Sequence, residues 1–162
     1  IEIGHRRIAM IAGISTDNDR ARERLEGVRT ALHAKGLVLP PAYVLERPYT
    51  IEDGREAMRA LMARDPRPTA VICGNDWLAI GALLEARAMG LAVPRDLSIT
   101  GFDDVAMAAQ MEPGLTTMRV DNARIGSLAA EYLLERLGGG TPSPVPPLVP
   151  ALIERGSTAP PR

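Results

Sequence analysis

The sequence is poor in cysteine, in unbalanced charge and in long apolar runs. Its one cysteine, Cys73, cannot form an internal disulfide, so a reducing, cytoplasmic location is expected. The formal net charge is −1, from 19 Lys and Arg against 20 Asp and Glu, which leaves no positive excess to hold a phosphate backbone. No apolar stretch approaches the roughly 20 residues that span a bilayer, and the first residues carry no signal-peptide pattern. By itself the chain is therefore not expected to bind DNA or cross a membrane.

The sequence motifs of common enzyme classes are missing as well. No G-x-G-x-x-G follows a strand, and neither G-x-x-x-x-G-K-[ST] nor G-x-S-x-G occurs. His5 and His33 have no Cys or His neighbour at metal-ligand spacing, and both are predicted to lie at the surface. We therefore expect no cofactor, no metal and no catalytic residue. A carboxylate pair, Asp103 and Asp104, leaves a metal-assisted hydrolase as one alternative.

What is present is an alternation of apolar runs with helical patterns. Four runs are typical of buried strands: 8–12, 43–45, 70–73 and 97–100. Helical periodicity follows the first three, over 19–35, about 50–64 and 76–89. Parallel neighbours need a crossover connection between them, and a helix normally supplies it. The pattern therefore predicts an α/β fold, a doubly wound, mostly parallel sheet with helices on both faces.

The end of the chain has a different character. A short helical stretch near 105–111 and an extended segment, 115–118, precede a helix over about 122–137. Three glycines, 138–140, and five prolines between 142 and 150 then form a stiff, poorly helical connector. Residues 152–153 are predicted to add one short edge strand.

Polar residues gather just after the predicted strands. In open α/β sheets, ligands bind in the crevice outside the carboxyl ends of the strands. A guanidinium, an amide, carboxylates and an aromatic ring are suited to a polyol or a heterocycle. The binding residues predicted on this basis are Arg24, Tyr49, Asn75 and Asp103, with Asp17, Asp76, Trp77 and Phe102 beneath them or at the rim.

Each of these residues also has a purely structural interpretation. Asn75 and Asp76 form a good helix N-cap pair, and Asp103 with Asp104 would suit a turn. Arg24 would be an ordinary solvated helical arginine. The aromatic side chains at 49, 77 and 102 would simply pack. Spacing alone does not decide between the two interpretations.

Several motifs resemble the LacI/GalR family of bacterial transcriptional regulators. They are Gly4-His5-Arg6-Arg7-Ile8, Arg24-Leu25-Glu26-Gly27, and the stretches 68–82, 90–104, 113–117 and 154–158. Together they cover nearly the whole chain in the family's order. The resemblance implies a two-lobed, periplasmic-binding-protein-like core with an effector in the cleft between its lobes, preceded by a helix-turn-helix domain. It also implies that the chain, which begins without Met, is a fragment.

The resemblance assigns parts of the chain to that architecture. Residues 1–121 would form the C-terminal lobe, 122–140 would belong to the interlobe crossover, and 141–162 would be the return segment and tail. By motif position, the family's effector contacts fall on Arg24, Asn75 and Asp103, with an aromatic contact near Tyr49. The family's homodimer contacts would fall near Ile80, Leu84, Met107 and Met111.

The predicted function is therefore effector binding in a transcriptional regulator. A sugar or small metabolite at the cleft would alter operator affinity, and operator DNA would bind through a domain absent from this chain. The alternative from another class is a solute-binding protein of a transport system, which shares the two-lobed fold.

Overall fold

Four parallel strands form the centre of the molecule. The computed structural model describes all residues from 1 to 162. The strands are β1 (Ile8–Gly13), β2 (Val44–Arg47), β3 (Ala70–Cys73) and β4 (Ser98–Thr100), arranged in the order β2-β1-β3-β4. All three neighbouring pairs are parallel. The predicted strands are all present, although β2 begins one residue later than expected and extends two residues further.

Each crossover between these strands contains a helix. They are α1 (Asp19–His33), α2 (Ile51–Met62) and α3 (Asp76–Ala88), and a 3-10 turn, Pro41–Tyr43, precedes β2. Side-chain oxygens of Asn18, Thr50 and Asn75 accept backbone N–H bonds at the three helix starts. Thr50 therefore caps the helix that the sequence predicts to begin at about residue 50.

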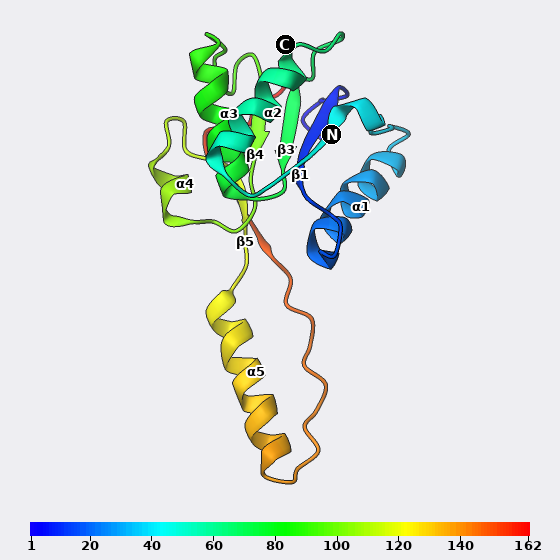
Figure 1. The fold of residues 1–162 in the computed structure, drawn as a ribbon, viewed down its shortest axis with the longest axis vertical. Coiled ribbons are helices and arrows are strands. Elements are labelled where there is room, and N and C mark those ends of the chain that lie inside the picture. Colours follow the sequence, from blue (N-terminus) through cyan, green and yellow to red (C-terminus); the bar gives the residue numbers. More distant parts are fainter.

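Helices cover both faces of the sheet, as predicted (Figure 1). All six residues of β1 are buried, and alternate side chains point to opposite faces. Ala9 and Ile11 belong to a core of 18 buried residues that includes side chains of α2 and α3. Ile8 and Met10 belong to a smaller core with side chains of α1. The two-sided burial confirms the doubly wound α/β class.

Two glycines let α2 and α3 pack backbone to backbone. A Cβ at Gly54 would lie 2.3 Å from the carbonyl oxygen of Leu78, and one at Gly81 would lie 2.1 Å from that of Ile51. Any larger residue would force the helices apart. The two helices pack together against β3, and the contact of Gly54 with Leu78 supports the N-terminal end of α3.

Beyond the sheet the chain leaves the lobe and returns to it. After α4 (Ala106–Gln110), strand β5 (Thr117–Arg119) leads out to α5 (Asn122–Leu137), and β6 (Ala151–Ile153) leads back. Strands β5 and β6 pair antiparallel, which confirms the predicted edge strand. Figure 1 shows α5 extending away from the body of the molecule.

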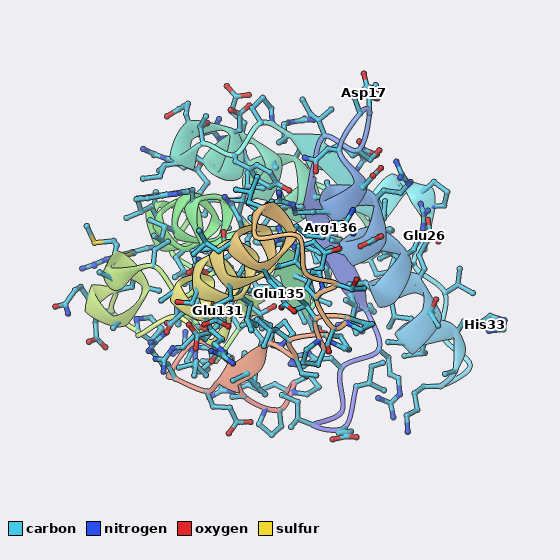
Figure 2. The ribbon with its side chains drawn as sticks, turned by 90° about the horizontal axis from the view of Figure 1, so that it is seen from below. Asp17, Glu26, His33, Glu131, Glu135 and Arg136 are labelled. Atoms are coloured by element: carbon cyan, nitrogen blue, oxygen red, sulfur yellow. The ribbon has the colours of Figure 1, made fainter.

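Helix α5 has an unpartnered apolar face. None of its residues is buried, and its exposed large apolar side chains are Ile125, Tyr132, Leu133, Leu134 and Leu137. Figure 2, seen along the helix, shows Glu131, Glu135 and Arg136 on the same element. No helix in the chain combines the length and apolar character that a membrane-crossing segment requires.

The prediction for the two histidines is right for one and wrong for the other. His33 lies at the exposed end of α1 (Figure 2). His5 is instead only 4% exposed. Its Nδ1 lies 2.9 Å from the Thr69 hydroxyl, and its Nε2 lies 3.1 Å from Ser98 Oγ and 2.9 Å from the Ala159 carbonyl oxygen. The His5 ring thereby holds the C-terminal tail to the lobe. The His5–Ala159 contact joins residues 154 positions apart, so no local pattern indicates it.

Candidate functional site

A polar hollow lies at the carboxyl ends of the parallel strands. Its volume is about 460 Å³. Its lining combines the predicted binding residues with the loop after β1 and the first turn of α1: Asp17, Asn18, Asp19, Arg20, Arg24, Tyr49, Asn75 and Asp103. The structure thus brings all four predicted binding residues, and Asp17, to one place. Asn18, Asp19 and Arg20 were missed, although their position directly after Asp17 was a usable signal.

Arg24 is held in the hollow by three groups. One guanidinium nitrogen donates a 2.8 Å hydrogen bond to the Gly74 carbonyl oxygen. The guanidinium carbon lies 3.9 Å from the centroid of the Phe102 ring. The other terminal nitrogen lies 3.8 Å from an Asp103 oxygen. Arg24 is therefore not the solvated surface arginine of the structural interpretation, and its remaining N–H donors are available to a bound molecule.

Asn75 combines a structural and a chemical role. Its Oδ1 accepts a 3.0 Å hydrogen bond from the Leu78 N–H, so the capping interpretation is confirmed. The side-chain amide nitrogen has no bond within the chain, and the residue lines the hollow. Capping leaves two amide donors free, so it fixes the side chain for binding instead of competing with it.

Asp103 lies in a conformation that L-residues rarely adopt. Its φ is 116°, and the following Asp104 has a φ of 55°. The Asp103 N–H donates to the Met118 carbonyl oxygen at 2.8 Å, which anchors the turn to β5. Burial raises the pKa of the Asp103 carboxyl, and the Asp76 charge adds to this, while Arg24 opposes it. Backbone strain held in place at a cleft is typical of functional positions.

Tyr49 forms the apolar wall of the hollow. A Cβ at Gly13 would lie 2.1 Å from the Tyr49 ring, so the glycine that ends β1 is what allows the ring to cross the strand end. The ring also packs against the larger core. A flat, half-buried ring beside polar donors is suited to the apolar face of a sugar.

The remaining rim predictions have other outcomes. Asp76 is fully buried and does not line the hollow: it accepts hydrogen bonds from the Thr117 hydroxyl at 2.6 Å and the Val105 N–H at 2.8 Å. Trp77 points outward from α3 and is 41% exposed. Phe102 borders the hollow only through Arg24. Helical and turn geometry rotate consecutive side chains apart, so neighbours in the sequence need not share the site.

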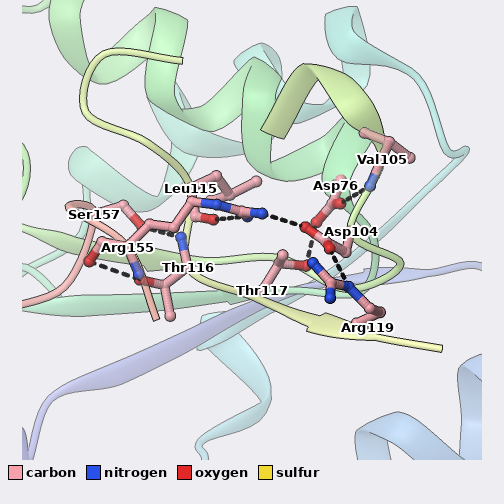
Figure 3. A network of polar contacts seen from close by, with 9 residues as sticks. All are labelled: Asp76, Asp104, Val105, Leu115, Thr116, Thr117, Arg119, Arg155 and Ser157. Carbon is pink, nitrogen blue, oxygen red and sulfur yellow. Dashed lines mark hydrogen bonds and ion pairs between the residues drawn. The ribbon is translucent and has the colours of Figure 1, made fainter. Parts of the chain in front are cut away.

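The hydrolase alternative has no geometric support. The Asp104 side chain is 7% exposed and does not line the hollow that Asp103 lines. Its two oxygens accept hydrogen bonds of 2.6 Å each from Arg119 and Arg155 (Figure 3). Since both oxygens are bonded to arginines, the two aspartates cannot share a cation. No group of three His, Cys, Asp or Glu side chains is placed to hold a metal.

This architecture is that of one lobe of a two-lobed small-molecule-binding protein. The lobe is an open parallel α/β layer with a polar hollow at the strand ends, one strand that leads out of it and one that leads back. Residues 1–158 match the family model described as periplasmic binding protein-like domain. The chain belongs to this family, in the branch formed by the LacI-family transcriptional regulators, as its motifs predicted.

Similar curated proteins are repressors. The ribose operon repressor of Escherichia coli is 39% identical over 158 residues, which are 97% of this chain and 48% of that protein. The HTH-type transcriptional repressor PurR of Haemophilus influenzae is 39% identical over 137 residues, 85% of this chain and 40% of that protein. The chain spans less than half the length of either. Both relatives are repressors and neither is an enzyme or a transport protein, which supports the prediction of a non-enzymatic regulator.

Similar solved structures belong to the same group. A LacI-family regulator from Mycobacterium smegmatis has a TM-score of 0.89 at 36% identity, covering 99% of this chain and 60% of that one. A complex of the transcriptional regulator CelR with cellobiose has a TM-score of 0.89 at 37% identity, covering 96% and 48%. The lac repressor dimer bound to operator and the anti-inducer ONPF has a TM-score of 0.87 at 28% identity, covering 98% and 54%.

Proposed function

We propose that this chain is the effector-binding lobe of a transcriptional repressor, in which a small molecule at the interlobe cleft changes operator affinity. The observation that carries the proposal is the convergence of Arg24, Tyr49, Asn75 and Asp103 on one hollow at the strand ends. These four residues come from four different segments: α1, the loop after β2, the N-cap of α3 and the turn after β4. They supply paired donors, an amide, an acceptor and a ring face within a single site.

The chemistry of the hollow favours a sugar or a similar polyol. The Asp103 carboxylate accepts from two adjacent hydroxyls, while Arg24 and Asn75 donate to others. Tyr49 covers the apolar face of the ring. The proposal agrees with the names of two relatives, a ribose operon repressor and a regulator in complex with cellobiose.

The other half of the cleft would come from a second lobe. In this proposal residues 1–121 form the lobe described here, residues 122–140 belong to the crossover into the partner lobe, and residues 141–162 return from it. The unburied apolar face of α5 supports this division, because such a face requires a packing partner. Operator DNA would bind through a further domain, since a net charge of −1 gives this chain no means of attracting a phosphate backbone. The regulator would act in the cytoplasm.

A homodimer is proposed to pack through α3 and α4. Leu84 and Trp77 on α3 are 40% and 41% exposed, and Met107 on α4 is half-exposed. Ile80, which was predicted at the same interface, is buried in the chain's own core, so it would support the interface from beneath. Met111 also packs against that core and is only partly exposed. The lac repressor, one of the similar structures, was solved as a dimer on its operator.

Switching requires a difference in affinity between two interlobe angles. An effector that bridges the lobes stabilises one angle, and the dimer transmits that angle to the DNA-binding heads. An effector with equal affinity for both angles would change nothing, however tightly it bound.

The test uses the intact protein that contains this chain. A thermal-shift screen of pentoses, hexoses, disaccharides including cellobiose, and nucleosides identifies compounds that stabilise the protein. Operator DNA selected from a random library is then titrated with and without each of them. We expect at least one compound to change operator affinity fivefold or more. Failure of every stabilising compound to change operator binding would contradict the proposed function.

A further inference from the structure

Two residues of the hollow are each followed by an aspartate whose side chain is buried and does not line it. Asn75 is followed by Asp76, and Asp103 by Asp104. Figure 3 shows the two second aspartates, Asp76 and Asp104, with their partners. Neither second aspartate lines the hollow. Both bind strand β5 or its flanks instead, so each hollow residue lies one peptide bond from a contact with the interlobe crossover.

Asp104 joins both crossover strands at one carboxylate. One oxygen accepts from Nε of Arg119, the last residue of outgoing β5, at 2.6 Å. The other accepts from Nη2 of Arg155, two residues after returning β6, at 2.6 Å. The second terminal nitrogen of Arg155 donates to the Leu115 carbonyl oxygen at 2.7 Å. The strand that leaves the lobe and the strand that returns are thereby held to the same side chain.

Asp76 reinforces this attachment from α3. Its carboxylate accepts from the hydroxyl of Thr117, the first residue of β5, and from the N–H of Val105, which precedes α4. A Cβ at Gly101 would lie 2.1 Å from an Asp76 oxygen, so the chain approaches the carboxylate closely there. This approach is what brings the 101–104 turn against β5.

The turn itself has little freedom to absorb a movement. Asp103 and Asp104 both have positive φ, and the Asp103 N–H is bonded to β5. Two consecutive residues in this region have few alternative conformations. A displacement of the Asp103 backbone would therefore also move Asp104, which shares the turn. Burial disfavours the charged form of Asp104, but hydrogen bonds from Arg155 and Arg119 outweigh it and hold its pKa below the ordinary value.

From this geometry we infer that Asp104 is a positioning residue, which couples the state of the hollow to the position of the two crossover strands. The inference rests on the proposed function and names the route by which the hollow would affect the interlobe angle. A contact between two sites counts as coupling only when a change at one alters the other. The experiment therefore changes a residue of the hollow and measures hydrogen–deuterium exchange at the two crossover strands.

The chain offers a matched control for a merely structural ion pair. Glu85 on α3 is a carboxylate that is 5% exposed and bridges two arginines, Arg55 at 3.0 Å and Arg59 at 2.7 Å. Its partners lie on α2, and no hydrogen bond or ion pair joins it to either crossover strand. Loss of Glu85 removes a buried double ion pair of the same kind without touching the proposed route.

The perturbation is Arg24→Met, which removes the cation 3.8 Å from Asp103. Hydrogen–deuterium exchange of peptides covering 117–119 and 151–153 is measured in the intact protein, in the parent, Asp104→Asn and Glu85→Gln backgrounds. We expect Arg24→Met to accelerate exchange at both strands about fivefold or more in the parent and in Glu85→Gln. In Asp104→Asn the further change should stay below twofold.

Arg119→Gln covers the case in which Asp104→Asn does not fold, because Arg119 is 57% exposed and its loss leaves the Arg155 pair intact. In that background the increase in exchange caused by Arg24→Met should fall at 117–119 and persist at 151–153.

Unchanged exchange at both strands on Arg24→Met in the parent overturns the inference. Equal responses in the Asp104→Asn and Glu85→Gln backgrounds overturn it too. Neither result depends on effector binding, so failure of the proposed function shows separately in the operator titration.

Discussion

The guanidinium of Arg24 lies over the ring of Phe102, 3.9 Å from its centroid, on the side of the sheet where four strands end. The same guanidinium is bonded to the Gly74 carbonyl oxygen. These contacts fix a long, flexible side chain before any effector arrives, which lowers the entropy lost on binding. Arg24 is therefore the residue on which effector affinity should depend most.

Replacing Arg24 with alanine should weaken the binding of an effector found in the screen about 10- to 100-fold. The reason is that charge-assisted hydrogen bonds contribute about 1.5–3 kcal/mol each. Arg24→Lys should recover little, because an ammonium lacks the planar fork. Titration calorimetry on the intact protein measures the change. Arg29→Ala on the outer side of α1, where Arg29 pairs only with Glu26, is the control and should bind as the parent does.

Replacing Asp103 with glycine should separate stability from binding. The φ of 116° at this position is open to glycine and costly for other residues. Asp103→Gly should therefore be about 1 kcal/mol more stable to urea than Asp103→Ala, while both variants lose effector affinity alike. Equal stability of the two variants would show that the turn is not strained at this residue.

Because His5 is buried, we predict that the free energy of unfolding falls as the solution becomes acidic. Burial lowers the pKa of His5 below its ordinary value of 6.5, the Ala159 carbonyl opposes this, and the N-terminal charge adds to the lowering. The unfolded chain therefore binds a proton at higher pH than the folded chain does. The contribution of His5 is fully present above pH 6.5 and is lost as the pH falls through 6.5 towards the folded-state pKa.

Urea denaturation between pH 7.5 and 5.5 tests this sign. The parent should lose more stability over that range than His5→Asn, which has no group that titrates there. At pH 7.5 the variant should already be less stable by about 1–3 kcal/mol, because the Thr69 and Ser98 hydroxyls and the Ala159 carbonyl lose a buried partner. Parallel pH profiles for the two proteins would contradict the assignment.

Leu84→Glu should dissociate the proposed homodimer. A carboxylate introduced at this exposed apolar position would be desolvated without a partner at the interface. The dimer dissociation constant should rise at least tenfold by sedimentation velocity, while the fold measured by circular dichroism is unchanged. Val38→Glu is the matched control, since Val38 is exposed in the loop after α1. A dimer that tolerates Leu84→Glu would exclude this face.

The predictability of the site differs from residue to residue for physical reasons. Asn75 and Asp103 could be found because parallel strands all point their carboxyl ends to one edge, so residues just after the strands must meet there. Arg24 lies further on, within α1, and its position in a motif of the family singled it out. Asp76 and Asp104 could not be told from their neighbours, because the side-chain direction of a capping or turn residue depends on dihedral angles that the type of residue does not reveal. The burial of His5 was missed because its partners lie 64, 93 and 154 residues away.

The order of strands and helices, the class of fold and the family follow from the chain alone, because hydrophobic periodicity and helix stops are local properties of the sequence. Tertiary structure decided which of two adjacent aspartates faces the hollow and which holds the crossover strands. It also decided that Ile80 supports α3 from within while Leu84 faces outward. Such choices depend on the angle at which packed elements meet, and that angle is set by contacts between distant residues, such as the close approach at Gly54 and Gly81.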